Sequence, residues 1–95
     1  MTTTTTALTA ARAEALFTSH LSTGSHPAYH VVEQAIRLAV RAHGGVRGCA
    51  ADVAAEYGDH PDLAVPRMRW ARDLIDDLYD RHHPTHRHTD WALVA

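Results

Sequence analysis

Arginines gather near the middle of this chain, where Arg67, Arg69 and Arg72 lie within two turns of a possible helix. The planar guanidinium group pairs bidentately with a guanine edge or with a phosphate. These three residues, together with Arg47, are therefore the candidates for contacting double-stranded DNA. Trp70 stands among them, and a tryptophan beside arginines is typical of a protein-interaction hot spot. The chemistry indicated is binding, either to DNA or to another protein.

The sequence shows no signature of catalysis or of a metal centre. Cys49 is the single cysteine, and no spacing indicates the histidine and third partner that a nucleophilic thiol needs. It is predicted to be a small core residue. Four histidines gather near the C-terminal end: His82, His83, His86 and His88. No cysteine or second spaced pair completes a tetrahedral site beside them, so we expect no enzyme activity, no cofactor and no metal.

The charge balance limits the possible partners. The 95 residues carry a formal net charge of −2, which gives no overall attraction to nucleic acid or to an anionic membrane. DNA binding would therefore depend on a local basic surface. No segment approaches the roughly 20 apolar residues needed to cross a membrane, and no secretory signal opens the chain. With its single cysteine, the protein is predicted to be cytoplasmic.

Apolar periodicity predicts an all-α fold with four helices and no strand. The expected helices cover residues 7–21, 27–43, 48–57 and 61–81. We expect a small helical domain over residues 7–81, a disordered N-terminus over residues 1–6 and a His-rich tail over residues 82–95. The tail could dock through Trp91, Leu93 and Val94.

The fourth helix carries an apolar seam. Met68, Ala71, Ile75 and Leu78 follow one another at spacings of three and four residues. The seam would be stabilised by packing against the same seam of a second copy of the chain, related by a twofold axis, so a homodimer is expected. The predicted interface consists of Trp70, Met68, Ile75 and Leu78. Pro66 either starts this helix or bends it.

The third and fourth predicted helices form a helix-turn-helix-like pair. Gly58 would supply the left-handed conformation of the turn, and Ala54 would be the small residue where the helices cross. Asp52 to Ile75 resembles, without a gap, region four of bacterial sigma factors and the LuxR-type regulators. The matching residues are Val53-Ala54, Gly58, Arg67 and Ala71-Arg72.

The resemblance implies that the helix after Gly58 enters the major groove of DNA. As a whole, the chain is similar to short, largely uncharacterised actinobacterial proteins through "HGGVRGCA" and "GDHP…RMRWAR", which implies no activity. The function expected is that of a small dimeric helix-turn-helix regulator of transcription. The alternative is a homo-oligomeric adaptor that binds protein and not DNA.

Overall fold

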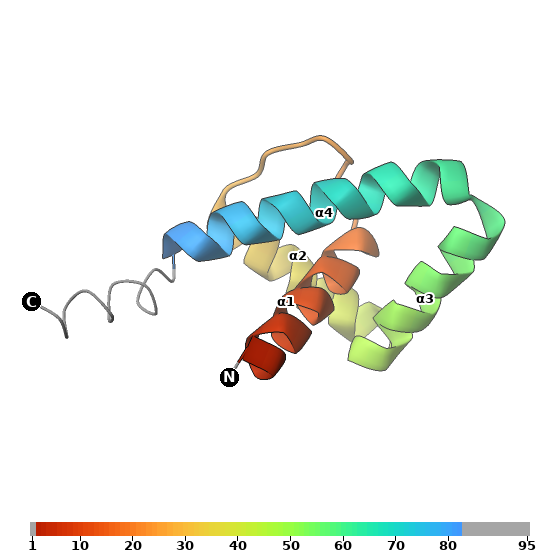
Figure 1. Cartoon of the computed structure of the whole chain (residues 1–95), viewed down its shortest axis with the longest axis horizontal. Coiled ribbons are helices and arrows are strands. Elements are labelled where there is room, and N and C mark those ends of the chain that lie inside the picture. Colours follow the sequence, from red (N-terminus) through yellow and green to blue (C-terminus); the bar gives the residue numbers. More distant parts are fainter. Residues whose placement is uncertain (1, 83–95) are drawn as a thin grey trace, which may run out of the picture.

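The computed structural model describes residues 2–82, and their side chains from Thr6 onward. Four α-helices and no strand make up this described part (Figure 1). The helices are α1 (Thr2–Phe17), α2 (Tyr29–Ala42), α3 (Val46–Asp59) and α4 (Pro61–His82). The prediction of an all-α fold with four helices is confirmed.

The ends of the chain differ in part from the predicted boundaries. The helix α1 begins at Thr2, inside the segment that was predicted to be disordered. Threonine lowers helix stability only slightly per residue, so a helix formed over the alanine-rich part can extend back through it. The helix α4 includes His82. The rest of the His-rich tail, with Trp91, Leu93 and Val94, lies outside the described residues.

The helices α1, α2 and most of α4 form a body with an apolar core. The most extensive contact between helices is that of α1 with α4. Leu16 and Phe17 of α1, Val32 of α2, and Ile75 and Leu78 of α4 are all buried in one cluster. The seam of α4 is therefore covered by other helices of the same chain.

A tight turn joins α2 to α3. Gly44 and Gly45 have φ angles of 78° and 99°, a region that glycine occupies without steric cost. The amide of Gly45 donates to the carbonyl oxygen of Val40 at 2.7 Å, which satisfies one of the last carbonyls of α2. At Gly48 an added Cβ would lie 1.5 Å from the carbonyl oxygen of His43. The start of α3 thus packs directly on the end of α2.

The connection between α3 and α4 is shorter than the predicted turn, because only His60 separates the two helices. Gly58 lies inside α3 and is not among the glycines with positive φ, so its prediction as a left-handed cap is wrong. The helix α3 ends instead at Asp59, and the amide of the next residue, His60, donates to the carbonyl oxygen of Glu56. Pro61 takes the first position of α4, where its missing N–H has no partner to lose.

Pro66 lies within α4 and does not start it. The helix has already begun before this proline, since the amides of Leu63 and Ala64 both donate to the carbonyl oxygen of His60. Proline removes one backbone hydrogen bond at this point, to the residue four positions earlier. The loss falls near the start of a helix of 22 residues, where the packed remainder of α4 can compensate for it.

Candidate functional site

The four residues of the predicted dimer interface lie inside the body. Met68, Trp70, Ile75 and Leu78 are all buried, so in this conformation they are not available to pair with a second copy. The apolar side chains of α1 cover the seam, and the segment between α1 and α2 covers Trp70. Its indole N–H donates to the carbonyl oxygen of Ser25 at 2.8 Å, which satisfies the polar atom of a buried ring.

Arg67 is committed to contacts within the chain. Its Nε donates to the carbonyl oxygen of Phe17 at 2.7 Å, and its two terminal nitrogens donate to Ser19 O at 3.0 Å and to Thr23 Oγ1 at 2.8 Å. The guanidinium also lies 4.9 Å from the ring centroid of Trp70. Burial lowers the pKa of Arg67 from its usual value. The guanidinium group of Arg67 thus binds backbone oxygens at and just after the end of α1, instead of standing free at the surface as a DNA contact would.

The other predicted arginines are exposed. Arg69 and Arg72 border a groove of about 300 Å³, here called the Tyr57 groove, which Tyr57, Val65, Met68 and Asp73 also line. Within the described residues, neither arginine has an ion-pair partner at 4.0 Å or less. Arg47 is exposed in the first turn of α3. The structure brings Arg69 and Arg72 together at one groove and places Arg67 apart from them.

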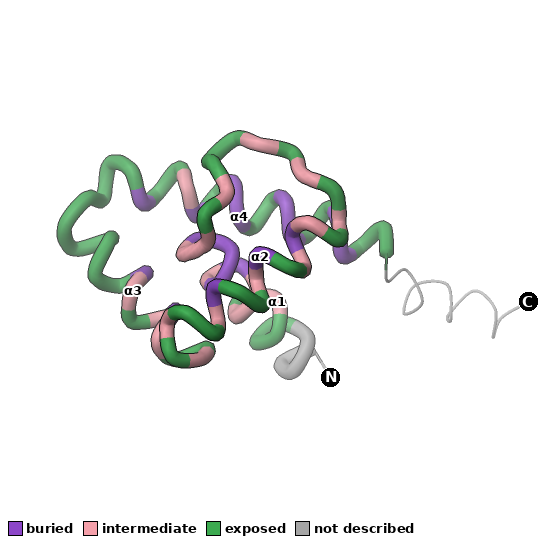
Figure 2. Tube along the Cα trace, turned by 180° about the vertical axis from the view of Figure 1, so that it is seen from behind, coloured by how far each residue is buried: buried purple, intermediate pink, exposed green. Residues whose placement is uncertain are grey.

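Apolar side chains are exposed where α3 meets α4. Every residue from 54 to 63 is exposed, and this part of the chain is green in Figure 2. Tyr57, Leu63 and Val65 are 37%, 64% and 43% exposed; we call this junction of the two helices the α3–α4 corner, with Tyr57 and Val65 on one side of it and Leu63 on the other. Sequence reasoning missed this surface, although Leu63 and Val65 fall off the apolar seam of α4, which was a usable signal.

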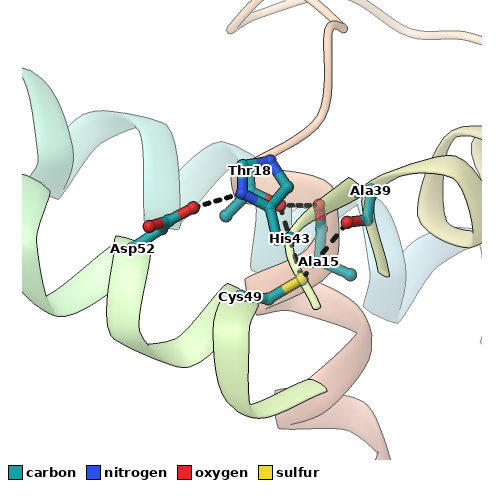
Figure 3. Close-up of polar contacts among 6 residues, drawn as sticks. All are labelled: Ala15, Thr18, Ala39, His43, Cys49 and Asp52. Carbon is teal, nitrogen blue, oxygen red and sulfur yellow. Dashed lines mark hydrogen bonds and ion pairs between the residues drawn. The ribbon is translucent and has the colours of Figure 1, made fainter. Parts of the chain in front are cut away.

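A larger cleft of about 560 Å³ lies between α3, the start of α4 and the end of α1. The imidazole Nδ1 of His43 pairs with the carboxylate of Asp52 at its wall (Figure 3). Glu56, Leu63 and Arg67 also line it. Leu63 of the corner therefore borders this cleft, whereas Tyr57 and Val65 of the corner border the Tyr57 groove.

Cys49 lies near His43 and Thr18, which line this cleft, and is itself fully buried (Figure 3). Its Sγ is 3.6 Å from the hydroxyl oxygen of Thr18 and 3.8 Å from the carbonyl oxygen of Ala39 (Figure 3). Ala15 and Ala39 complete a small apolar cluster around the thiol. The prediction that Cys49 is a core residue is confirmed.

The described residues hold no group of three or more His, Cys, Asp or Glu side chains that could bind a metal ion. The two histidine–carboxylate pairs stand separately, as His43 with Asp52 and His60 with Glu56. None of the four helices, over the part of the chain that is described, is long and apolar enough to span a membrane.

Comparison with known proteins identified no relative of this chain. No family model matches the sequence, and neither the curated proteins nor the solved structures gave a significant match. The function of the chain therefore has to be inferred from its own surface.

Proposed function

We propose that this protein is an interaction module, an adaptor that binds another protein through the α3–α4 corner. The observation that carries the proposal is the position of the exposed apolar side chains. Six large apolar side chains are exposed in the described part of the chain. Three of them, Tyr57, Leu63 and Val65, lie at the corner, on two consecutive helices joined by one residue.

The energetics favour a surface that is covered by a partner. Burying a Leu or Val side chain contributes about 1.5–3 kcal/mol relative to leaving it in water. At the corner these side chains remain exposed in the folded chain, so this free energy would be gained only when a partner covers them. Tyr57 adds an aromatic ring with a polar hydroxyl, a residue type enriched at interaction hot spots. Arg69 and Arg72 supply charges at the rim, where charges steer encounter more than they add affinity.

A second copy of the chain is the first partner to consider. The predicted homodimer cannot use the seam of α4 in this conformation, because that seam is buried. The corner offers an alternative apolar surface that is already exposed. A symmetric dimer through it would place the same patch of both subunits at the interface.

A second candidate function is DNA binding by a transcriptional regulator. It is favoured by the exposure of Arg69, Arg72 and Arg47 and by the lack of ion-pair partners for Arg69 and Arg72 among the described residues. Against it, Asp59 and Asp62 place negative charge at the start of α4, which would oppose the approach of a phosphate. Protein binding is therefore the better-supported proposal.

The test compares two exposed leucines. Leu63 is at the corner, whereas Leu38 is exposed on α2 and serves as the matched control. A photoreactive residue at position 63 should form a discrete covalent adduct in cells, with a second copy or another protein, and the same residue at position 38 should not. Equal labelling at both positions, or labelling at neither, would contradict the proposal.

A separate binding experiment tests the DNA alternative. The protein is incubated with a pool of random DNA duplexes at low and moderate salt. Retention of one enriched sequence, lost in the Arg69→Gln/Arg72→Gln variant and kept in Leu63→Asp, would replace the adaptor proposal by DNA binding. Phosphate contacts would show as a steep dependence of retention on salt.

A further inference from the structure

The Tyr57 groove has an apolar floor and a rim that carries two arginines and one aspartate. Tyr57 of α3 and Val65 and Met68 of α4 line the floor, and Arg69, Arg72 and Asp73 line the rim, so the arginines outnumber the carboxylate. Its volume of about 300 Å³ is at the lower end of the range of about 300–1,000 Å³ for ligand pockets. Such a groove suits one or two side chains of a peptide segment better than a whole packed helix.

The arginines at the rim differ from others on the surface. Arg37 and Arg81 each pair with a carboxylate four residues earlier, Glu33 and Asp77. Arg69 and Arg72 have no such pair within the described residues. Since guanidinium groups select carboxylates through charge-assisted hydrogen bonds, the occupant of the groove should carry a carboxylate next to a bulky apolar side chain.

We propose that the occupant is the chain's own segment over residues 90–94, Asp-Trp-Ala-Leu-Val. It combines the carboxylate of Asp90 with the apolar side chains of Trp91, Leu93 and Val94. Trp91 would lie on the apolar floor of the groove, and Asp90 would pair with the guanidinium groups at the rim.

The length of the chain allows this contact within one molecule. From His82, the last residue of α4, back to Arg72 and Arg69 is about 15 and 20 Å along the helix, at 1.5 Å per residue. The chain from His82 forward to Asp90 spans up to about 26–29 Å when extended, at 3.3–3.6 Å per residue. Asp90 can therefore reach either arginine if the segment runs back along α4.

The order of charges supports this antiparallel direction. A segment that leaves His82 and returns along α4 passes the acidic part of the helix, where Asp76 and Asp73 are exposed, before it reaches the arginines. The same segment carries Arg87, with histidines on both sides, before Asp90. Basic residues thus lie opposite acidic ones and the carboxylate lies opposite the arginines, which is the complementarity that fixes register between two surfaces.

Docking of this segment would cover Tyr57 and Val65, two of the three apolar residues of the corner. It would then compete with a partner protein, and this regulatory consequence rests on the proposed function. The docking itself does not depend on a partner. The two can therefore be tested separately.

The test uses methyl NMR spectra of the full chain. The indole ring of a docked Trp91 should shift the methyl signals of Val65 and Met68, and Trp91→Ala should remove these shifts while the methyls of Leu8 and Leu38 stay unchanged. Arg69→Gln/Arg72→Gln should reproduce the loss, whereas Arg47→Gln, an exposed arginine outside the groove, should not.

Three results would overturn the inference. In one, Trp91→Ala leaves the Val65 and Met68 methyls unchanged. In another, the methyl shifts grow with protein concentration, which would place the segment in the groove of a second molecule. In the third, Arg47→Gln has the same effect as the double variant, which would make the charge effect nonspecific. Photocrosslinking at position 63 that persists in Trp91→Ala would show that the adaptor function survives the failure of this inference.

Discussion

The body and the α3–α4 corner use the same residue types in opposite ways. In the body Leu16 is 0% exposed, whereas Leu63 at the corner is 64% exposed. Both are leucines on helices of one small domain, so the difference arises from what covers them. In the body, apolar side chains are buried against one another and stabilise the fold. At the corner, apolar side chains remain in contact with solvent. A surface that folding does not need is available for binding.

The largest difference in stability is expected between two variants, each with one leucine shortened to alanine, one in the body and one at the corner. Leu16→Ala should lower the free energy of unfolding by about 2–5 kcal/mol, because a fully buried side chain leaves a cavity. Leu63→Ala should change it by less than about 0.5 kcal/mol. Chemical denaturation of both variants measures the difference. Similar losses would mean that the corner is part of the folding core.

Two glycines of α3 provide the next comparison. Gly48→Ala should destabilise the fold by about 1–3 kcal/mol, because the new Cβ overlaps the backbone carbonyl of His43, the residue that directly follows α2, and this junction must shift. A Cβ at Gly58 meets no atom within 4 Å. Gly58→Ala should therefore stabilise by about 0.5–1 kcal/mol, since alanine favours a helix over glycine. Thermal unfolding should shift in opposite directions for the two variants; a Gly58→Ala variant that unfolds earlier than the native chain would argue for a turn at this position.

A smaller difference in stability is expected between substitutions of two arginines that are separated by one residue. Arg67→Ala removes donors from the carbonyl oxygens of Phe17 and Ser19 and should lower the free energy of unfolding by about 1–2 kcal/mol. Arg69→Ala, at an exposed position, should have almost no effect. Arg67→Lys should restore only part of the loss, because an ammonium group lacks the planar fork. Equal stability of Arg67→Ala and Arg69→Ala in urea would refute this role of Arg67.

The smallest effect concerns alkaline pH and lies in the body. Burial and the hydrogen bond that Tyr79 donates to Glu33 raise the pKa of Tyr79 above the usual 10.0. Above pH 10 the unfolded chain releases this proton while the folded chain retains it, so the free energy of unfolding should fall with rising pH. Below pH 10 the contribution is fully present.

Replacing Tyr79 by Phe should make this alkaline decline shallower. The pKa of Tyr29 is also raised by burial, so part of the decline should remain in the variant. Urea denaturation between pH 8 and pH 11 gives the two slopes, and identical slopes would exclude Tyr79 as their source.

The helices were predictable from sequence because each buries a periodic apolar stripe. Residues such as Ala71 and Ile75 repeat at helical spacing, and both are buried. The connections were harder to predict. A glycine inside a helix costs about 1 kcal/mol, a penalty that packing can offset, so Gly58 alone could not show where α3 ends. The single-residue junction at His60 follows from the position of Pro61.

The candidate site was less predictable, because sequence spacing does not show which partner a side chain meets. Arg67 and Arg69 look equivalent in the sequence. Two of the three acceptors of Arg67 are the backbone carbonyl oxygens of Phe17 and Ser19, about fifty residues away, and no sequence pattern marks a backbone acceptor. The seam of α4 was identified correctly, but whether another helix of the chain or a second copy covers it depends on tertiary packing.

The contact between α1 and α4 has a consequence for synthesis on the ribosome. Among the four described helices, the two that share the most extensive contact are α1, which is made before the others, and α4, which is made after them. Until α4 has emerged, Leu16 and Phe17 lack the cover that they have in the folded body. A nascent chain that ends at α3 should therefore stay sensitive to protease and bind chaperones that recognise exposed apolar segments. Protection should appear in one step, when α4 is complete.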